Sequence, residues 1–243
     1  KDNFNKTVFL ISCFFVATSV FIVFTSLFFR NDVMQITKVL FLTLSLLSFI
    51  YLFFCIKNFN FIRLRVLFVP YFFFLFMVSH LVNYLSYDGL SNTQNLFENP
   101  MLSFHVILSL LSYTLLTLSV LTAASVYLLE RNLKTDYSKK LNLIQVFPSI
   151  YESEKITINL LLLTELFLFF SLITGFIYST IESTYLDFLL NNKSILSIIT
   201  FILILLLLIK KMLFGLSGRK IFNFVLASFL FINVAYFGLK FIE

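Results

Sequence analysis

"LSFHVILSLLSYTLLTLSVLTAASVYLL", residues 102–129, is an apolar run long enough to cross a lipid bilayer as one helix. About 20 residues are needed, because a helix rises 1.5 Å per residue and the hydrocarbon layer is roughly 30 Å thick. Similar runs recur along the chain, which has 243 residues, 60% of them hydrophobic and 35 of them Phe. A membrane β-barrel would instead show segments of roughly ten alternating residues.

The sequence therefore predicts an all-α fold, a polytopic transmembrane bundle of about seven helices that forms a single integral membrane domain over residues 1–243. We expect a multi-pass protein of the bacterial inner membrane. The two cysteines, Cys13 and Cys55, form no CxxC motif, and we expect them to be small buried hydrophobic residues. The predicted spans are 7–29, 38–56, 66–86, 102–129, 157–179, 194–209 and 221–239.

Basic residues set the predicted orientation, because Lys and Arg near helix ends favour the cytoplasmic side. With the amino terminus inside and the carboxyl terminus outside, fourteen of the eighteen basic residues fall on the inner side. The net charge of +6 then reflects topology and contact with anionic lipid, and it implies no nucleic-acid partner. The four basic residues predicted outside are Arg30, Lys38, Lys193 and Lys240.

His105 is one of three ionisable groups placed inside the predicted spans, where each costs roughly 2.5 to 3.5 kcal/mol unless it is paired or in a polar cavity. It lies near the outer end of its span. Three serines fall within about 40° of it at 100° per residue, and such a stripe should face protein or ligand instead of lipid. These serines are Ser109, Ser112 and Ser119.

His80 is the second group and the only other histidine of the chain. It lies near the outer end of the preceding antiparallel span, so the two imidazoles are predicted at nearly the same height. Two imidazoles at one level would suit a haem or another metal centre. The alternative for each is an interfacial imidazole bonded to a hydroxyl or carbonyl. Asn83, Tyr84 and Tyr87 share the face of His80.

Glu165 is the third group, in "LLLLTELFLFF" of the fifth span. Burial disfavours a carboxylate, so we expect a protonated or hydrogen-bonded side chain. A proton relay and a packing hydrogen bond both stay open. An enzyme is not expected, because neither HExxH nor a serine paired with histidine or lysine at a protease-like spacing appears.

From residue 99 onward the chain resembles the cytochrome c assembly family of haem-handling membrane proteins, and most closely its short inner-membrane branch typified by YpjD and HemX-like proteins. The resemblance covers about three fifths of the chain, and order and spacing agree. It rests on "HVILSLLSYTLLTLSVLTAASVYLLERNLK" from His105, "LITGFIYS" around Gly175, "NNKSILSIITF" from Asn191 and "GRKIFNFVLASFLFINVAYFGLKF" from Gly218.

The resemblance implies that His105 is an axial haem ligand on the outer side. It also implies that Lys193 pairs with an acidic residue or a haem propionate, and that the "GRK" beginning at Gly218 is framework. The departures are a missing tryptophan-rich "WWD" segment, no histidine after His105, and Asn192 where the branch often has histidine. Only His105 remains of the family's ligand set.

Two readings follow. In the first, a haem-handling accessory protein of cytochrome c assembly holds haem near the outer leaflet through His105, with His80 or an external group as second ligand. Aromatic side chains at Tyr84, Tyr87 and Phe104 would pack on the macrocycle, and other cytochrome c biogenesis membrane proteins are candidate partners. In the second, the same bundle lacks a cofactor and acts through partner contacts or in transport.

Overall fold

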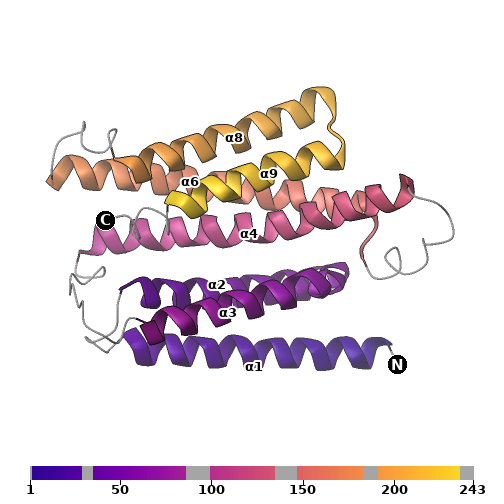
Figure 1. Ribbon diagram of the computed structural model, residues 1–243, viewed down its shortest axis with the longest axis horizontal. Helices are drawn as coiled ribbons and strands as arrows, with labels where there is room; N and C mark the ends of the chain where they lie inside the picture. The colour runs from indigo at the N-terminus through magenta and orange to yellow at the C-terminus, as the bar shows by residue number, and fades with distance from the viewer. Residues whose placement is uncertain (1, 29–34, 86–98, 135–146, 183–190, 236–243) are drawn as a thin grey trace. The chain divides into compact units, whose positions relative to one another are not determined.

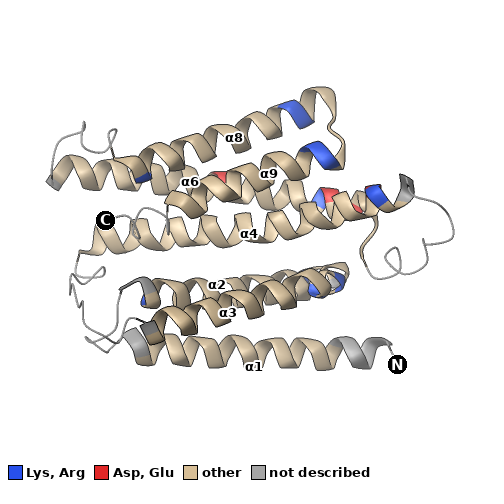
Figure 2. Cartoon of the chain, viewed as in Figure 1, with Lys and Arg blue, Asp and Glu red and all other residues tan. Residues whose placement is uncertain are grey.

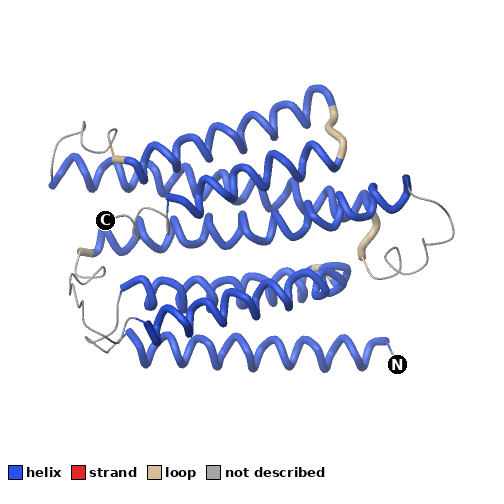
Figure 3. The backbone as a smooth tube through the Cα atoms, viewed as in Figure 1, coloured by secondary structure: helices blue, strands red, loops and turns tan. Residues whose placement is uncertain are grey.

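The structure, a computed structural model, describes residues 2–28, 35–85, 99–134, 147–182 and 191–235. All of its regular elements there are helical (Figure 3). The chain divides into two compact units, Lys1–Leu96 and Phe97–Glu243. The α-helices labelled in Figure 1 are α1 Asp2–Phe28, α2 Gln35–Lys57, α3 Arg65–Leu85, α4 Pro100–Lys134, α6 Ile150–Glu182, α8 Asn192–Phe214 and α9 Gly218–Asn233. A 3₁₀ helix, η1 Phe59–Leu64, lies between α2 and α3.

The predicted fold class is confirmed. Within the described residues, six helices are long and apolar enough to cross a membrane, and each coincides with one predicted span. The seventh predicted span, 221–239, corresponds to α9, and its last residues lie outside the described ranges. The chain is thus a multi-pass membrane protein. The single domain stays a prediction, because the two units are described separately.

Local signals explain where the helices begin and end. Asn99 and Asn191 cap α4 and α8, each accepting a backbone N–H from two residues ahead at 3.0 and 2.9 Å. Ser149 and Glu152 form a reciprocal capping box at the start of α6, with both bonds at 3.3 Å. At the other end of α8, Gly215 has φ 62°, which a side chain disfavours and which stops the helix.

Several helices are longer than the sequence pattern predicts, among them α6 and α8. The capping box starts α6 at Ile150, several residues before the predicted 157, so the predicted inner loop 130–156 is shorter. Helix α8 continues past the predicted end at 209, where two lysines break the apolar run. Both lysines are accommodated: Lys211 pairs with Glu154 of α6, and Lys210 lies over a ring of α9. The two lysines therefore do not end the helix.

The first unit has an aromatic core. Helix α2 packs against α1 and α3, and Phe41 and Leu44 are almost fully buried in it. Tyr51 stacks on Phe68 with ring centroids 3.7 Å apart. Cys55 is buried, as predicted, whereas Cys13 is only partly buried, and both are free thiols.

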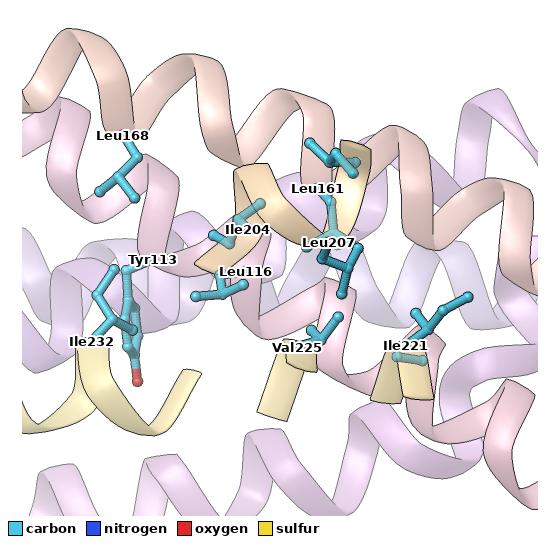
Figure 4. Close-up of a cluster of buried hydrophobic side chains, with 11 residues drawn as sticks. Tyr113, Leu116, Leu161, Leu168, Ile204, Leu207, Ile221, Val225 and Ile232 are labelled. Atoms are coloured by element: carbon cyan, nitrogen blue, oxygen red, sulfur yellow. The ribbon is translucent and has the colours of Figure 1, made fainter. Parts of the chain in front are cut away.

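The second unit is organised around α4, which packs most extensively against α6 and next against α9. Helix α8 contacts both α6 and α9. Side chains of all four helices meet in one hydrophobic cluster (Figure 4). Its labelled members are Tyr113, Leu116, Leu161, Leu168, Ile204, Leu207, Ile221, Val225 and Ile232.

The serine stripe of α4 is buried, as the sequence predicts. Ser109 is 3% exposed, and Ser112 and Ser119 are 0% exposed. Their hydroxyls donate to carbonyls of α4 itself, so they need no ligand to be satisfied. Small side chains of this kind let two helices approach closely. One hydroxyl pair bridges the helices directly: the oxygens of Thr157 and Thr122 are 2.9 Å apart.

Candidate functional site

His105 lies on the second turn of α4 and faces α6. Its Nδ1 is 2.8 Å from the backbone carbonyl oxygen of Ser171 on α6. The serine stripe of α4 begins one turn after His105, at Ser109. The hydroxyl oxygens of Ser171 and Thr174 lie 3.5 and 3.4 Å from the same nitrogen. The imidazole is partly buried and is held between two helices. The ring therefore does not simply point into lipid.

The carbonyl contact assigns the proton of His105. A carbonyl oxygen only accepts, so Nδ1 must carry the hydrogen and donate it to Ser171. In the neutral ring the lone pair then lies on Nε2. Nε2 has no hydrogen-bond partner among the residues that the structure describes. An imidazole oriented through one nitrogen by a carbonyl, with the other nitrogen available, is the usual arrangement of a metal-ligating histidine.

His80 lies on α3, in the first unit, and is exposed. Its ring meets the edges of two aromatic side chains, with centroid distances of 5.4 Å to Phe41 and 4.4 Å to Phe76. His80 and His105 belong to different compact units. Their convergence on one metal stays a prediction.

The remaining predicted site residues are at helix ends. Tyr84 is 79% exposed on α3, and Phe104 is 54% exposed on α4. Lys193 is exposed on the first turn of α8, where its backbone N–H donates to Oδ1 of Asn191. Tyr87 lies outside the described residues. The exposed rings at Tyr84 and Phe104 are therefore available for contact with lipid or a ligand.

Glu165 occupies the middle of α6. Both carboxyl oxygens are buried and have no hydrogen-bond partner among the described residues. One of the two alternatives for Glu165 was a packing hydrogen bond, and no such bond is formed with the residues that the structure describes. Within the same residues, no group of three or more His, Cys, Asp and Glu side chains is placed to hold a metal ion.

Sequence reasoning missed a second polar contact, between α4 and α9. One carboxylate oxygen of Glu130 accepts the N–H of Gly218 at 2.7 Å, and the other accepts the N–H of Arg219 at 3.3 Å. These are among the first N–H groups of α9, which have no partner inside the helix. Glu130 thus caps a helix that it does not belong to. The sequence does show a glutamate directly after one apolar run, and it shows Gly-Arg-Lys directly before the last apolar run.

Gly218 is required by this close approach. A Cβ at that position would lie 2.5 Å from Cγ1 of Val126 and 2.8 Å from Cδ and Oε1 of Glu130. Val126 is 1% exposed and cannot easily move away. The "GRK" sequence therefore acts as framework, as the sequence resemblance implies: its glycine lets α9 contact α4, and its first two N–H groups bind the carboxylate.

Comparison with known proteins gives a family. The model of the cytochrome C assembly protein family matches residues 7–243. A protein of Azospirillum brasilense, described as an uncharacterized 28.8 kDa protein in the nifR3-like 5′ region, is 30% identical over 141 residues. This alignment covers 58% of the chain and 51% of the relative, so the chain spans about half the length of that relative. No solved structure matches the chain. Since the family model covers nearly the whole sequence, the chain belongs to the cytochrome c assembly protein family.

Proposed function

We propose that this membrane protein handles haem during cytochrome c assembly, and that Nε2 of His105 would bind the iron. Family membership supports the role in cytochrome c biogenesis. The single observation that supports the ligand is the 2.8 Å contact from Nδ1 to the carbonyl oxygen of Ser171. That contact orients the ring and leaves Nε2 as the coordinating nitrogen.

The chemistry of the site fits this group. Haem iron accepts neutral imidazole, and the partly buried position of His105 would limit access of water to it. A haem supplies a redox-active iron and a large apolar ring, and the exposed Phe104, on the same turn of α4, is suited to contact such a ring. The bundle would contribute the orientation of the ligand and the apolar surroundings.

His80 is our candidate for the second ligand, with a group outside the chain as the alternative. Its imidazole is exposed, and it is flanked by Phe41 and Phe76, whose rings would restrict its orientation. Tyr84, one turn further on α3, is a second exposed aromatic side chain. Lys193 is the candidate partner of a haem propionate, because it is a cation at the predicted outer end of α8. We expect these groups to lie at the outer face of a bacterial inner membrane.

The alternative is a cofactor-free subunit of the same fold that acts through membrane partners or in transport, without enzymatic activity of its own. It is supported by the absence from the sequence of the tryptophan-rich segment and of any histidine besides His80 and His105. Shared ancestry is compatible with either role, because related folds can differ in function.

An absorption spectrum of the purified protein tests the proposal. We expect a Soret band in protein from haem-replete membranes, lost in His105→Ala and shifted in His80→Ala as one ligand is exchanged. Tyr113→Phe is the matched control: it removes one buried hydroxyl of α4, bonded to Asn233 at 3.1 Å, and should keep the band. A protein that stays colourless with added haemin, while remaining monodisperse, contradicts the proposal. Stoichiometric co-purification of a membrane partner would then favour the alternative.

A further inference from the structure

The connection between α8 and α9 carries an unusual group of cations. Lys210, Arg219 and Lys220 are all exposed there, and basic segments of α8 and α9 lie near their joined ends (Figure 2). Nζ of Lys210 is 5.5 Å from the ring centroid of Phe224. Lys220 precedes Phe224 by four residues and so lies on the same face of α9. Lys210 therefore contacts this ring, and Lys220 lies one turn before it on α9.

The acidic side chains nearby already have partners. Glu154 pairs with Lys211, and Glu130 accepts two backbone N–H groups at the start of α9. Within the described ranges, Lys210, Arg219 and Lys220 form no ion pair with any of them. The positive charge of this surface is therefore available to an anion.

An apolar stripe leads to the same cations. Ile202, Leu206 and Lys210 are spaced by four residues, so they follow one face of α8, and the first two are 48% and 41% exposed. Beyond Lys210 the last three residues of the helix are also apolar and strongly exposed: Met212 85%, Leu213 69% and Phe214 81%. A cation between two exposed apolar segments is typical of a helix end at a membrane interface.

We propose that this surface binds an anionic phospholipid. Lys210 and Lys220 bind the phosphate, with the ring of Phe224 holding the Lys210 ammonium beside it, and an acyl chain follows Leu206 and Ile202 along α8. Charge complementarity selects the headgroup, and the continuous apolar stripe selects a lipid over a free phosphate or an acidic peptide. The site is independent of haem, and it agrees with the orientation that the basic residues predict.

Native mass spectrometry of the full chain released from detergent micelles tests this. Phosphatidylglycerol and phosphatidylcholine of identical acyl chains are titrated separately. We expect the wild type to retain phosphatidylglycerol preferentially, and the double variant K210Q/K220Q to weaken its apparent affinity about thirtyfold, as expected for loss of two interfacial cations. K210R/K220R keeps both charges and should keep the binding.

The matched control is K57Q/R63Q, which removes two exposed cations from the predicted inner side of the first unit. It should weaken binding by less than about twofold, because a general surface potential is shared by all basic residues whereas a site is not. Equal losses in the two double variants, or equal retention of both lipids by the wild type, would overturn the proposal. So would glycerophosphoglycerol, which lacks acyl chains, competing as well as the intact lipid. Far-UV circular dichroism checks that each variant remains helical.

Discussion

Helices α4 and α1 are both long and apolar enough to span a membrane, yet the protein uses them differently. The spanning window of α4 is 72% buried inside the protein and that of α1 only 11%. Their hydroxyl groups show the reason. In α1, Ser12, Thr18 and Ser19 are bonded to their own helix. In α4 the hydroxyls also donate to their own helix, but they are buried, and Thr122 in addition accepts a hydrogen bond from Thr157 of α6.

The comparison shows that apolarity does not decide which helix becomes the centre of a membrane bundle. Lipid and protein are equally apolar, so burial depends on close approach and on polar contacts between helices. Helix α4 has both, through Thr122 along its length and Glu130 at its end. Substitutions in these contacts should therefore cost stability, and matched substitutions in α1 should not.

Gly218→Ala should have the largest effect. The added Cβ would overlap Val126 and the carboxyl group of Glu130 and push α9 away from α4. We expect a loss of about 3 kcal/mol in the free energy of unfolding, combining overpacking with weakened hydrogen bonds. Unfolding in a denaturing detergent, followed by circular dichroism, measures it. Ser217→Ala is the control, because this neighbouring exposed side chain makes no capping hydrogen bond. Similar losses for the two variants would contradict the close contact.

Glu130→Ala should rank second, at about 2 kcal/mol, because it removes a charged acceptor and leaves the N–H of buried Gly218 without a partner. Glu130→Gln should cost less, since an amide oxygen can still accept one bond. The same detergent titration measures both. The exposed neighbour Arg131 supplies the control, as Arg131→Gln. If Glu130→Ala and Arg131→Gln unfold at the same detergent concentration, the capping of α9 by Glu130 does not stabilise the protein.

Thr157→Val should have the smallest effect, about 0.6 kcal/mol, the average for hydrogen bonds between membrane helices. It removes the hydroxyl contact with Thr122 at nearly constant volume. Ser19→Ala in α1 is its counterpart, because that exposed hydroxyl contacts only the carbonyl of Val16 in the same helix. Thermal unfolding midpoints of the two variants compare them. A greater loss in Ser19→Ala would reverse the distinction drawn between the helices.

Much of this fold is readable from local patterns. Apolar length predicts six of the described helices, and the serine stripe below His105 predicts which face of α4 is buried. Both depend on a helical period that a single segment displays by itself. The carboxyl end of α8 is less predictable, because Lys210 and Lys211 resemble the end of a membrane span until their partners on other helices are known.

The candidate site was predictable only in part. An imidazole within an apolar run identifies His105 as a residue that needs a partner. The partner is a backbone carbonyl of α6, 66 residues away, and every residue has a carbonyl, so no sequence pattern singles out that of Ser171. Glu130 was missed for a related reason. At the end of a span it resembles a loop residue, and its role depends on the N–H groups of a helix 88 residues later.

The contact between Glu130 and Gly218 has a consequence for biosynthesis. Ribosomes make the amino-terminal part of a chain first, so the carboxylate near the end of α4 is synthesised well before the last helix leaves the exit tunnel. The acceptor of the first two amide groups of α9 is therefore made before α9 itself. In a chain truncated after α8, the carboxylate of Glu130 would lack the two N–H donors of α9.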